Sequence, residues 1–470
     1  MMRVKGAHSV EMLGEESNPP TEVLTMQNSV SDDLFPLVPG KEVTARFDGG
    51  EVTSDAGLLL VAEADRKLGL TEKLAAQIVD RREPWKVAHR MIDLLRERVY
   101  AIAAGYEDAN DLDGLGADPA LLTACGKEPC GDGTLGSQPT ISRFENSVDR
   151  KDLLCASMAL AEMVMGQLPQ NTKKVVLDVD ATDDPCHGQQ ELECFNGFYD
   201  EHCYVPLLLY VTGQDRRQRL LAAMLRPGNA SSKVGLFAMV RRAVGLLRAR
   251  FPKIQITLRA DSGFGDGEVL SFCEAEGISY VLGLSSNQRL RALSSSTEEA
   301  VLARSRKQGR DVRVHKALSY QANSWECERR VICKAETVRG QLNVRFAVTD
   351  RGSKAKAVYR FLCQRGDMEN RIKEMKIDLA SGRTSCHRFW ANQFRLLLHT
   401  AASVLMSALQ EAAEGTRLQN AQAGTLRLKL IKIGARVQST CRRIWFQLPT
   451  SCPMQDVWSH VHQRLAVGVT

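Results

Sequence analysis

The chain has 470 residues, of which 44% are hydrophobic and 25% are charged, as expected for a globular protein of two to four domains. Its net charge of +6 permits a polyanionic partner without requiring one. The 13 cysteines include no CxxC pair, and residues 1–28 have no apolar signal-peptide run, so we expect reduced thiols in a cytoplasm. No apolar stretch is long enough to cross a bilayer, and we expect no membrane role.

The N-terminal third is predicted to be helical after a flexible leader. Residues 1–45 have little apolar periodicity and many polar residues. From Ser54 to Leu168 the apolar residues recur at helical spacing. The segment from Gln138 to Arg143 follows a helix-start signal at Ser137, and both a DNA-reading helix and a core helix fit it.

The pattern changes at Lys173, where β-branched runs begin. Three consecutive strands, then a helix, a strand, a helix and a strand predict a mixed α/β sheet. The predicted strands are Lys174–Asp180, Tyr204–Thr212, Gln218–Leu225, Ile254–Ala260 and Tyr280–Leu284, and the helices are Ser232–Arg250 and Gly267–Glu276.

Short strands follow in the segment 290–352, and a long amphipathic helix is predicted over Phe389–Ala412. These patterns divide the chain into five regions. They are the leader (1–45), a helical region (46–170), an α/β domain (171–289 and 353–412), a β-rich insertion (290–352) and a basic C-terminal segment (413–470).

Acidic residues stand at the ends of two predicted strands. Asp178 and Asp180 share one face of their strand because side chains alternate. Asp261 directly follows the strand that ends at Ala260, at the edge where open α/β sheets place ligands. Each acid alone also fits a cap or a turn. Together they suit oxygen-preferring cations such as Mg²⁺.

A third acid, Glu369, lies in a charged helical segment. Arg365, Glu369, Lys373 and Lys376 would share one helix face, at steps of four, four and three residues. A solvated face of ion pairs fits this spacing. The spacing fits a second interpretation equally, in which Glu369 binds a metal and the flanking cations bind DNA phosphates.

Seven segments, in this order, resemble bacterial insertion-sequence transposases of the DDE class, close to insertion-sequence family 1380. They are Val52–Gly57, Gly105–Asp111, Ser137–Glu145, Leu177–Asp183, Arg259–Phe264, Arg365–Lys376 and Cys386–Gln393. The resemblance implies a ribonuclease-H-like fold with a β-rich insertion before the last acidic helix. It also implies a Mg²⁺ cofactor, with Mn²⁺ as a substitute.

The resemblance implies a role for individual residues. A small residue and Thr182 follow the first family Asp, which selects Asp180 over Asp178, and the second Asp and the Glu correspond to Asp261 and Glu369. The family helix signature is Y-x2-R-x3-E-x6-K, and Arg365 and Lys376 match its phosphate-binding R and K. Leu362 replaces the signature Tyr, and we do not expect Tyr359, one turn earlier, to substitute for it.

Other basic residues are candidates for a DNA track. In the segment Arg427–Leu430 basic and apolar residues alternate, as in an edge strand with one basic face. Such a face could be exposed to solvent or bind the DNA backbone, and both fit equally well. The predicted DNA-binding residues are Arg365, Lys373, Lys376, Arg427, Lys429 and Lys432. Cys186, His187, Cys194, His202 and Cys203 lie close together, but their spacing does not match a zinc motif.

These observations predict a DNA transposase that cuts at the terminal inverted repeats of an element and joins the ends to target DNA. The helical region would recognise the repeats, and a homodimer would hold two ends, in the bacterial cytoplasm at the nucleoid. Two alternatives remain: a ribonuclease-H-like nuclease that does not join ends, and an inactive DNA-binding descendant that still carries Asp180, Asp261 and Glu369.

Overall fold

The computed structural model describes residues 33–34, 38–41, 43–131 and 133–466, which form two units, 1–50 and 51–470. In the first unit, β1 (Asp33–Leu34) pairs with β2 (Thr44–Ala45) in antiparallel orientation. Most of the predicted leader, 1–45, lies outside the described residues. Every element below belongs to the second unit. None of its described helices is long and apolar enough to cross a membrane.

An eight-stranded sheet in the order β12-β13-β14-β11-β10-β4-β8-β9 forms the centre of the second unit. The neighbours β4, β10 and β11 are parallel, and the other pairs are antiparallel. In chain order, the first five strands of this sheet are β4 (Lys174–Ala181), β8 (Leu207–Thr212), β9 (Gln218–Met224), β10 (Gln255–Ala260) and β11 (Ser279–Leu284). They confirm the predicted mixed α/β sheet, and their order is compatible with a ribonuclease-H-like fold.

One predicted strand is divided in two. Tyr204 ends β7 (Glu201–Tyr204), and β8 begins only at Leu207. Pro206 between them has no backbone N–H to continue a ladder. With β5 (Asp184–Pro185) and β6 (Cys194–Asn196), β7 forms a separate three-stranded sheet.

The segment 290–352 differs from the prediction in two ways. It contains α10 (Gln288–Gln308), which the sequence did not indicate because serines interrupt its weak apolar stripe. Its strands β12 (Arg313–Tyr320), β13 (Arg329–Val338) and β14 (Gln341–Thr349) are longer than predicted. They extend the central sheet, through the antiparallel pairing of β14 with β11, instead of forming a separate unit.

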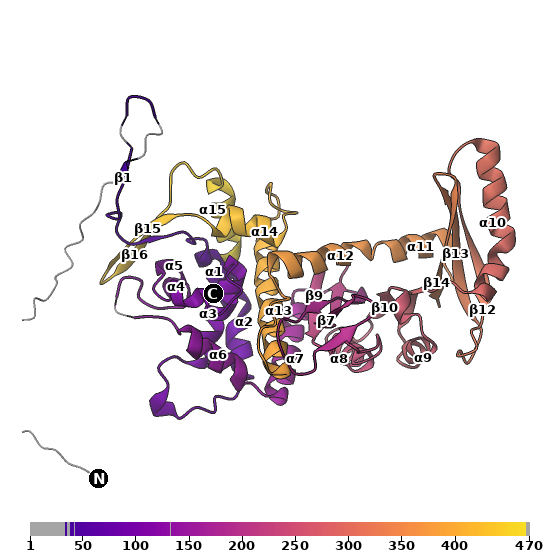
Figure 1. The fold of residues 1–470 in the computed structure, drawn as a ribbon, viewed down its shortest axis with the longest axis horizontal. Helices are drawn as coiled ribbons and strands as arrows, with labels where there is room; N and C mark the ends of the chain where they lie inside the picture. The colour runs from indigo at the N-terminus through magenta and orange to yellow at the C-terminus, as the bar shows by residue number, and fades with distance from the viewer. Residues whose placement is uncertain (1–32, 35–37, 42, 132, 467–470) are drawn as a thin grey trace, which may run out of the picture. The chain divides into compact units, whose positions relative to one another are not determined.

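Helices cover both faces of the sheet (Figure 1). On one face lie α8 (Leu236–Arg250) and α9 (Gly267–Ala275), close to their predicted bounds. On the other face, α11 (Ala355–Cys363) and α12 (Gly366–Lys373) follow each other end to end. In α12 the buried residues Met368 and Ile372 are four positions apart, so the polar side of the helix stays open.

The central helix α13 (Phe389–Ala412) has its predicted bounds and is buried on nearly all sides. It packs against β9 of the sheet and against helices of the N-terminal region. That region is helical as predicted. Its helices are α1 (Leu58–Leu68), α2 (Leu70–Ala75), α3 (Met91–Ala104), α4 (Asp111–Leu115), α5 (Pro119–Ala124), α6 (Gln138–Ser147) and α7 (Arg150–Gly166), with a short 3₁₀ turn at Pro84–Lys86.

The C-terminal segment joins the N-terminal region. The strand β15 (Ala435–Thr440) lies between β16 (Arg443–Gln447) and β3 (Val52–Thr53), and α15 (Gln455–Ala466) packs on α1 and α13. The predicted edge strand at Arg427–Leu430 is wrong, because α14 (Ala423–Leu426) continues into a π-helical turn, Arg427–Ile431. Buried Leu426, Leu430 and Ile431 form its inner face, and Leu428 is 63% exposed.

Candidate active site

Two predicted catalytic acids lie at the same level on neighbouring parallel strands. Ala260 of β10 pairs with Val179 of β4, so the next residues, Asp261 and Asp180, face the same edge of the sheet. Asp261 directly follows its strand, and its carboxylate accepts a hydrogen bond from the N–H of Gly263 at 2.9 Å. Gly265, in the same loop, lies so close to β11 that a Cβ there would be 2.4 Å from the carbonyl oxygen of Gly283.

The third strand acid, Asp178, has a structural role. It is fully buried, and both carboxylate oxygens accept hydrogen bonds from Arg259, at 2.6 and 2.9 Å. Gln218 donates a further bond to it at 2.9 Å. Arg259 also donates to the carbonyl of Phe361 at 2.6 Å, which attaches the end of α11 to the sheet. Asp178 is therefore committed to an internal ion pair, unlike the partly exposed Asp180.

Arg365 joins Asp180 to the third predicted acid. Its guanidinium lies 2.5 Å from the Asp180 carboxylate and 2.8 Å from that of Glu369, the predicted i,i+4 partner. Burial raises the pKa of Asp180 to about 6; the charge of Arg365 opposes this rise, and the nearby Asp261 carboxylate adds to it. The pKa is raised because burial outweighs the ion pair with Arg365.

The end of the charged helix turns toward the loop after β4. A π-helical turn, Glu374–Asp378, follows α12, and Lys376 in this turn donates to the carboxylate of Asp183 at 2.8 Å. Lys373 is exposed to solvent. Asp184, which follows Asp183 and begins β5, is buried and accepts a hydrogen bond from the Thr384 hydroxyl at 3.0 Å. Burial raises the pKa of Asp184 to about 7. Lys376 is thus bound to the segment that follows the Asp180 strand.

The donor atoms suit a divalent cation, but the three acids do not form one closed cluster. Asp180 and Asp261 present carboxylate oxygens, which Mg²⁺ and Mn²⁺ prefer. The carboxylate of Glu369 is bound to the Arg365 guanidinium. Among the residues that the structure describes, no group of three His, Cys, Asp or Glu side chains is close enough to hold one ion. Asp180 and Asp261 thus supply two carboxylates at one edge of the sheet, and the third predicted acid is engaged by Arg365.

The predicted C-terminal basic residues have different environments. Lys429 is exposed to solvent. The guanidinium of Arg427 donates to the carbonyl of Ala103 at 2.9 Å and to that of Asp378. The ammonium group of Lys432 lies 2.7 Å from the Asp55 carboxylate and 3.8 Å from the centre of the Tyr106 ring. Arg427 and Lys432 therefore tie the C-terminal segment to the helical region.

The position of the missing signature tyrosine is apolar. Leu362 packs against a small cluster that includes Val281 and Ile332. Tyr359 is buried in the same cluster, and its ring lies 5.5 Å from that of His315. Tyr359 therefore faces the core, and that it does not substitute for the signature tyrosine stays a prediction.

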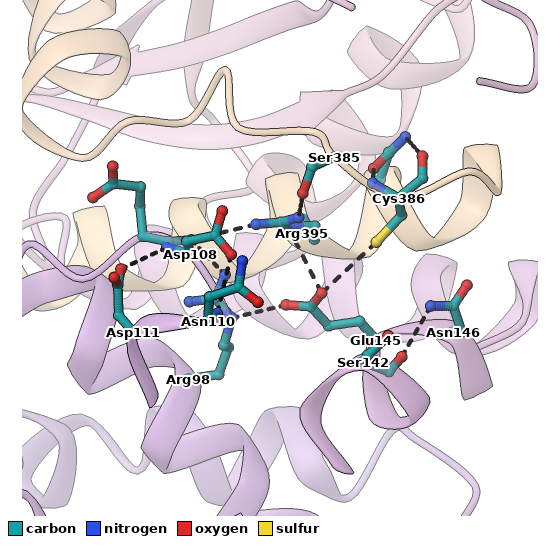
Figure 2. Close-up of polar contacts among 12 residues, drawn as sticks. Arg98, Asp108, Asn110, Asp111, Ser142, Glu145, Asn146, Ser385, Cys386 and Arg395 are labelled. Atoms are coloured by element: carbon teal, nitrogen blue, oxygen red, sulfur yellow. Dashed lines mark hydrogen bonds and ion pairs between the residues drawn. The ribbon is translucent and has the colours of Figure 1, made fainter. Parts of the chain in front are cut away.

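Three of the family-like segments meet in a buried polar cluster away from the acids (Figure 2). Arg98 of α3 is fully buried and lies 2.8 Å from Glu145 of α6. The guanidinium of Arg395 on α13 lies 3.8 Å from the same carboxylate, and both arginines donate to the carbonyl of Glu107. Cys386 also contacts Glu145. These segments therefore join the helical region to α13. In the segment Gln138–Arg143 at the start of α6, Ile141 is buried while Pro139 and Arg143 are exposed, so a DNA-reading helix and a core helix both still fit it.

Two residues near the acids were missed as site candidates from the sequence. Asp183, which binds Lys376, was recognised only as part of a motif. Tyr199, which lies in the turn between β6 and β7, had no recognisable signal. Burial raises its pKa to about 12, and the negative charges of Asp183, Asp180 and Asp261 contribute to the rise. Its hydroxyl is thus within electrostatic reach of the predicted site.

Comparison with known proteins gives a family but no close characterised relative. No curated protein matches the chain. A family model described as "Transposase DDE domain group 1" matches residues 35–468, which include the helical region, the central sheet with its insertion and nearly all of the C-terminal segment. The chain belongs to this family of DDE transposases.

Proposed function

We propose that this protein is a metal-dependent DNA transposase that cuts at the terminal inverted repeats of an insertion sequence and joins the ends to target DNA. The observation that carries the proposal is the placement of Asp180 and Asp261 on neighbouring parallel strands, with Glu369 linked to Asp180 through Arg365. The family supports transposition in general. The narrower resemblance to insertion-sequence family 1380 is part of the proposal.

Asp180, Asp261 and Glu369 would hold Mg²⁺ or Mn²⁺, and bound divalent ions supply an activated water and stabilise the departing phosphate oxygen. The protein's own contribution would be to bring Asp180 and Asp261 to one edge of the sheet and to hold Glu369 next to Asp180 through Arg365, whose charge compensates both carboxylates in the free state. Once Glu369 releases Arg365, the planar guanidinium is suited to bind a DNA phosphate through two parallel hydrogen bonds.

The same edge would guide the DNA backbone. Lys376 lies beside the acids, while Lys373 and Lys429 are exposed and accessible to phosphates. Arg427 and Lys432, whose charged groups have internal partners, are left out of this surface. The helical region would recognise the terminal repeats, and a homodimer would hold the two ends together. We place the reaction in the bacterial cytoplasm, at the nucleoid.

Substitution of Glu369 tests the site. The DNA flanking the coding region supplies the element ends as substrates. Glu369→Gln is expected to abolish Mg²⁺-dependent cleavage and to leave end binding intact in a gel-shift assay, because only the third acid is lost. Asp367→Asn is the matched control, since Asp367 is an exposed acid on the same helix. Unchanged cleavage by Glu369→Gln, or equal loss in both variants, would refute the assignment.

A further inference from the structure

A hairpin with an aromatic turn stands next to the predicted active site. The strand β5 begins three residues after β4 ends, and it pairs with β7, which pairs in turn with β6. The chain passes from β6 to β7 through Gly197, Phe198, Tyr199 and Asp200. The hairpin is therefore attached to the same strand end that carries Asp180.

The hairpin is held firmly in this position. Asn196 accepts hydrogen bonds from the N–H groups of Phe198 and Tyr199, at 2.9 and 3.2 Å, and donates to the carbonyl of Gly228 at 2.6 Å. Gly228 fits so closely that a Cβ would lie 2.2 Å from the carbonyl oxygen of Cys203. A few residues further, Ser232 donates to the carbonyl of Gly263 in the Asp261 loop, at 2.7 Å. The turn is thus connected to the Asp180 strand through the chain and to the Asp261 loop through these hydrogen bonds.

The turn exposes one aromatic ring and partly covers a second. Phe198 is 86% exposed, although its side chain is entirely apolar. Its ring meets the half-buried Tyr199 ring edge to face, with centroids 4.9 Å apart and an interplanar angle of 89°. Tyr199 lies in the hairpin that follows β4 and Asp180 in the chain, and the charges of Asp183, Asp180 and Asp261 add to the rise that burial causes in its pKa, so the turn lies on the side of the predicted reaction site. Water is a poor environment for such a ring, whereas a nucleobase offers it a flat surface.

We propose that Phe198 stacks on the terminal nucleobase of a cleaved element end and holds that end in the active site until it is joined. The inference rests on the proposed transposase function. Bases inside a duplex already stack on both faces, but cleavage leaves a terminal base with one face open. An aromatic ring stacks on any base, so the contact would not depend on sequence. The ring of Tyr199 contacts that of Phe198 edge to face, which leaves the rest of the Phe198 ring open to a base.

Photocrosslinking tests this contact in the full-length protein. The probe is a precleaved element end whose terminal nucleotide is 5-iododeoxyuridine, and mass spectrometry locates the crosslink. We expect it at Phe198. Phe198→Ala should lose it and join precleaved ends about 10- to 100-fold more slowly, as expected for a lost base–aromatic stack. Binding of uncut DNA should change little, and Phe198→Trp should restore joining.

Phe195→Ala is the control, because Phe195 lies on the same hairpin, is 53% exposed and has its ring against His202. An equal loss in this variant, or normal joining by Phe198→Ala, would overturn the inference while leaving the transposase function intact. A changed association state of Phe198→Ala with an unchanged crosslink would instead assign the ring to a protein contact. Wild-type protein that neither binds nor joins the ends would refute the proposed function and this inference with it.

Discussion

Replacement of Asp180 by Asn is expected to stabilise the metal-free protein at about pH 8, whereas replacement of Asp178 by Asn is expected to destabilise it. Both acids lie on one face of β4, and both changes are nearly isosteric. They differ in their partners. Asp178 has a buried ion pair with Arg259, while the charge of Asp180 is only partly compensated at the sheet edge.

The magnitudes follow from these environments. The pKa of Asp180 rises from its ordinary 3.8 to about 6, a difference of about two units, and one unit corresponds to about 1.4 kcal/mol. Because the folded state keeps this proton to higher pH, wild-type stability falls as pH rises from about 4 to about 6. Asn does not titrate, so the gain from Asp180→Asn should reach about 3 kcal/mol above that window. Removing one charge of a buried pair, as in Asp178→Asn, costs about 3–5 kcal/mol.

Urea unfolding without divalent metal, followed by tryptophan fluorescence at about pH 4.5 and about pH 8, measures both effects. The difference between Asp180→Asn and wild type should be small at the lower pH and large at the higher one. Asp178→Asn should be less stable than wild type at both. A destabilised Asp180→Asn at the higher pH, or a difference that does not depend on pH, would refute the reasoning.

Two further predictions concern the packing of the helical region. Arg98→Met should lower the free energy of unfolding by about 3–5 kcal/mol, because buried Glu145 loses its closest cation; an unchanged urea midpoint would contradict this. Gly57→Ala should be strongly destabilising, because its Cβ would lie 1.8 Å from the carbonyl oxygen of Leu430. Gly434→Ala, whose Cβ would be 3.9 Å from its nearest neighbour, is the control, and equal melting temperatures for the two variants would contradict the prediction.

Local sequence patterns were sufficient for most of the central fold. The β-branched run before Asp180 predicts a strand, and the run before Asp261 predicts another, with a helix between them. Because parallel strands align their carboxyl ends, the two acids could be expected at one edge. The helical spacing from Arg365 to Glu369 also predicted their ion pair correctly.

The features of the fold and of the site that were not predicted depend on contacts between segments that are distant in the sequence. Nothing near Arg427 indicates that its guanidinium reaches the carbonyl of Ala103, and the alternation of Leu and basic residues there resembled a strand although it forms a π-helical turn. The approach of Tyr199 to the acids depends on the pairing of β5 with β7. The ion pair of Arg365 with Asp180 depends on the position of the charged helix over the sheet, which no local pattern indicates.

Joining of precleaved element ends to target DNA is the measurement that tests transposition most directly. In the presence of Mg²⁺ the wild-type protein is predicted to produce joined DNA, and Asp261→Asn is predicted to bind the ends without joining them. Ends that stay unjoined while uncut substrate is cleaved would identify a nuclease instead. Joining that persists in Asp261→Asn would contradict the assigned site.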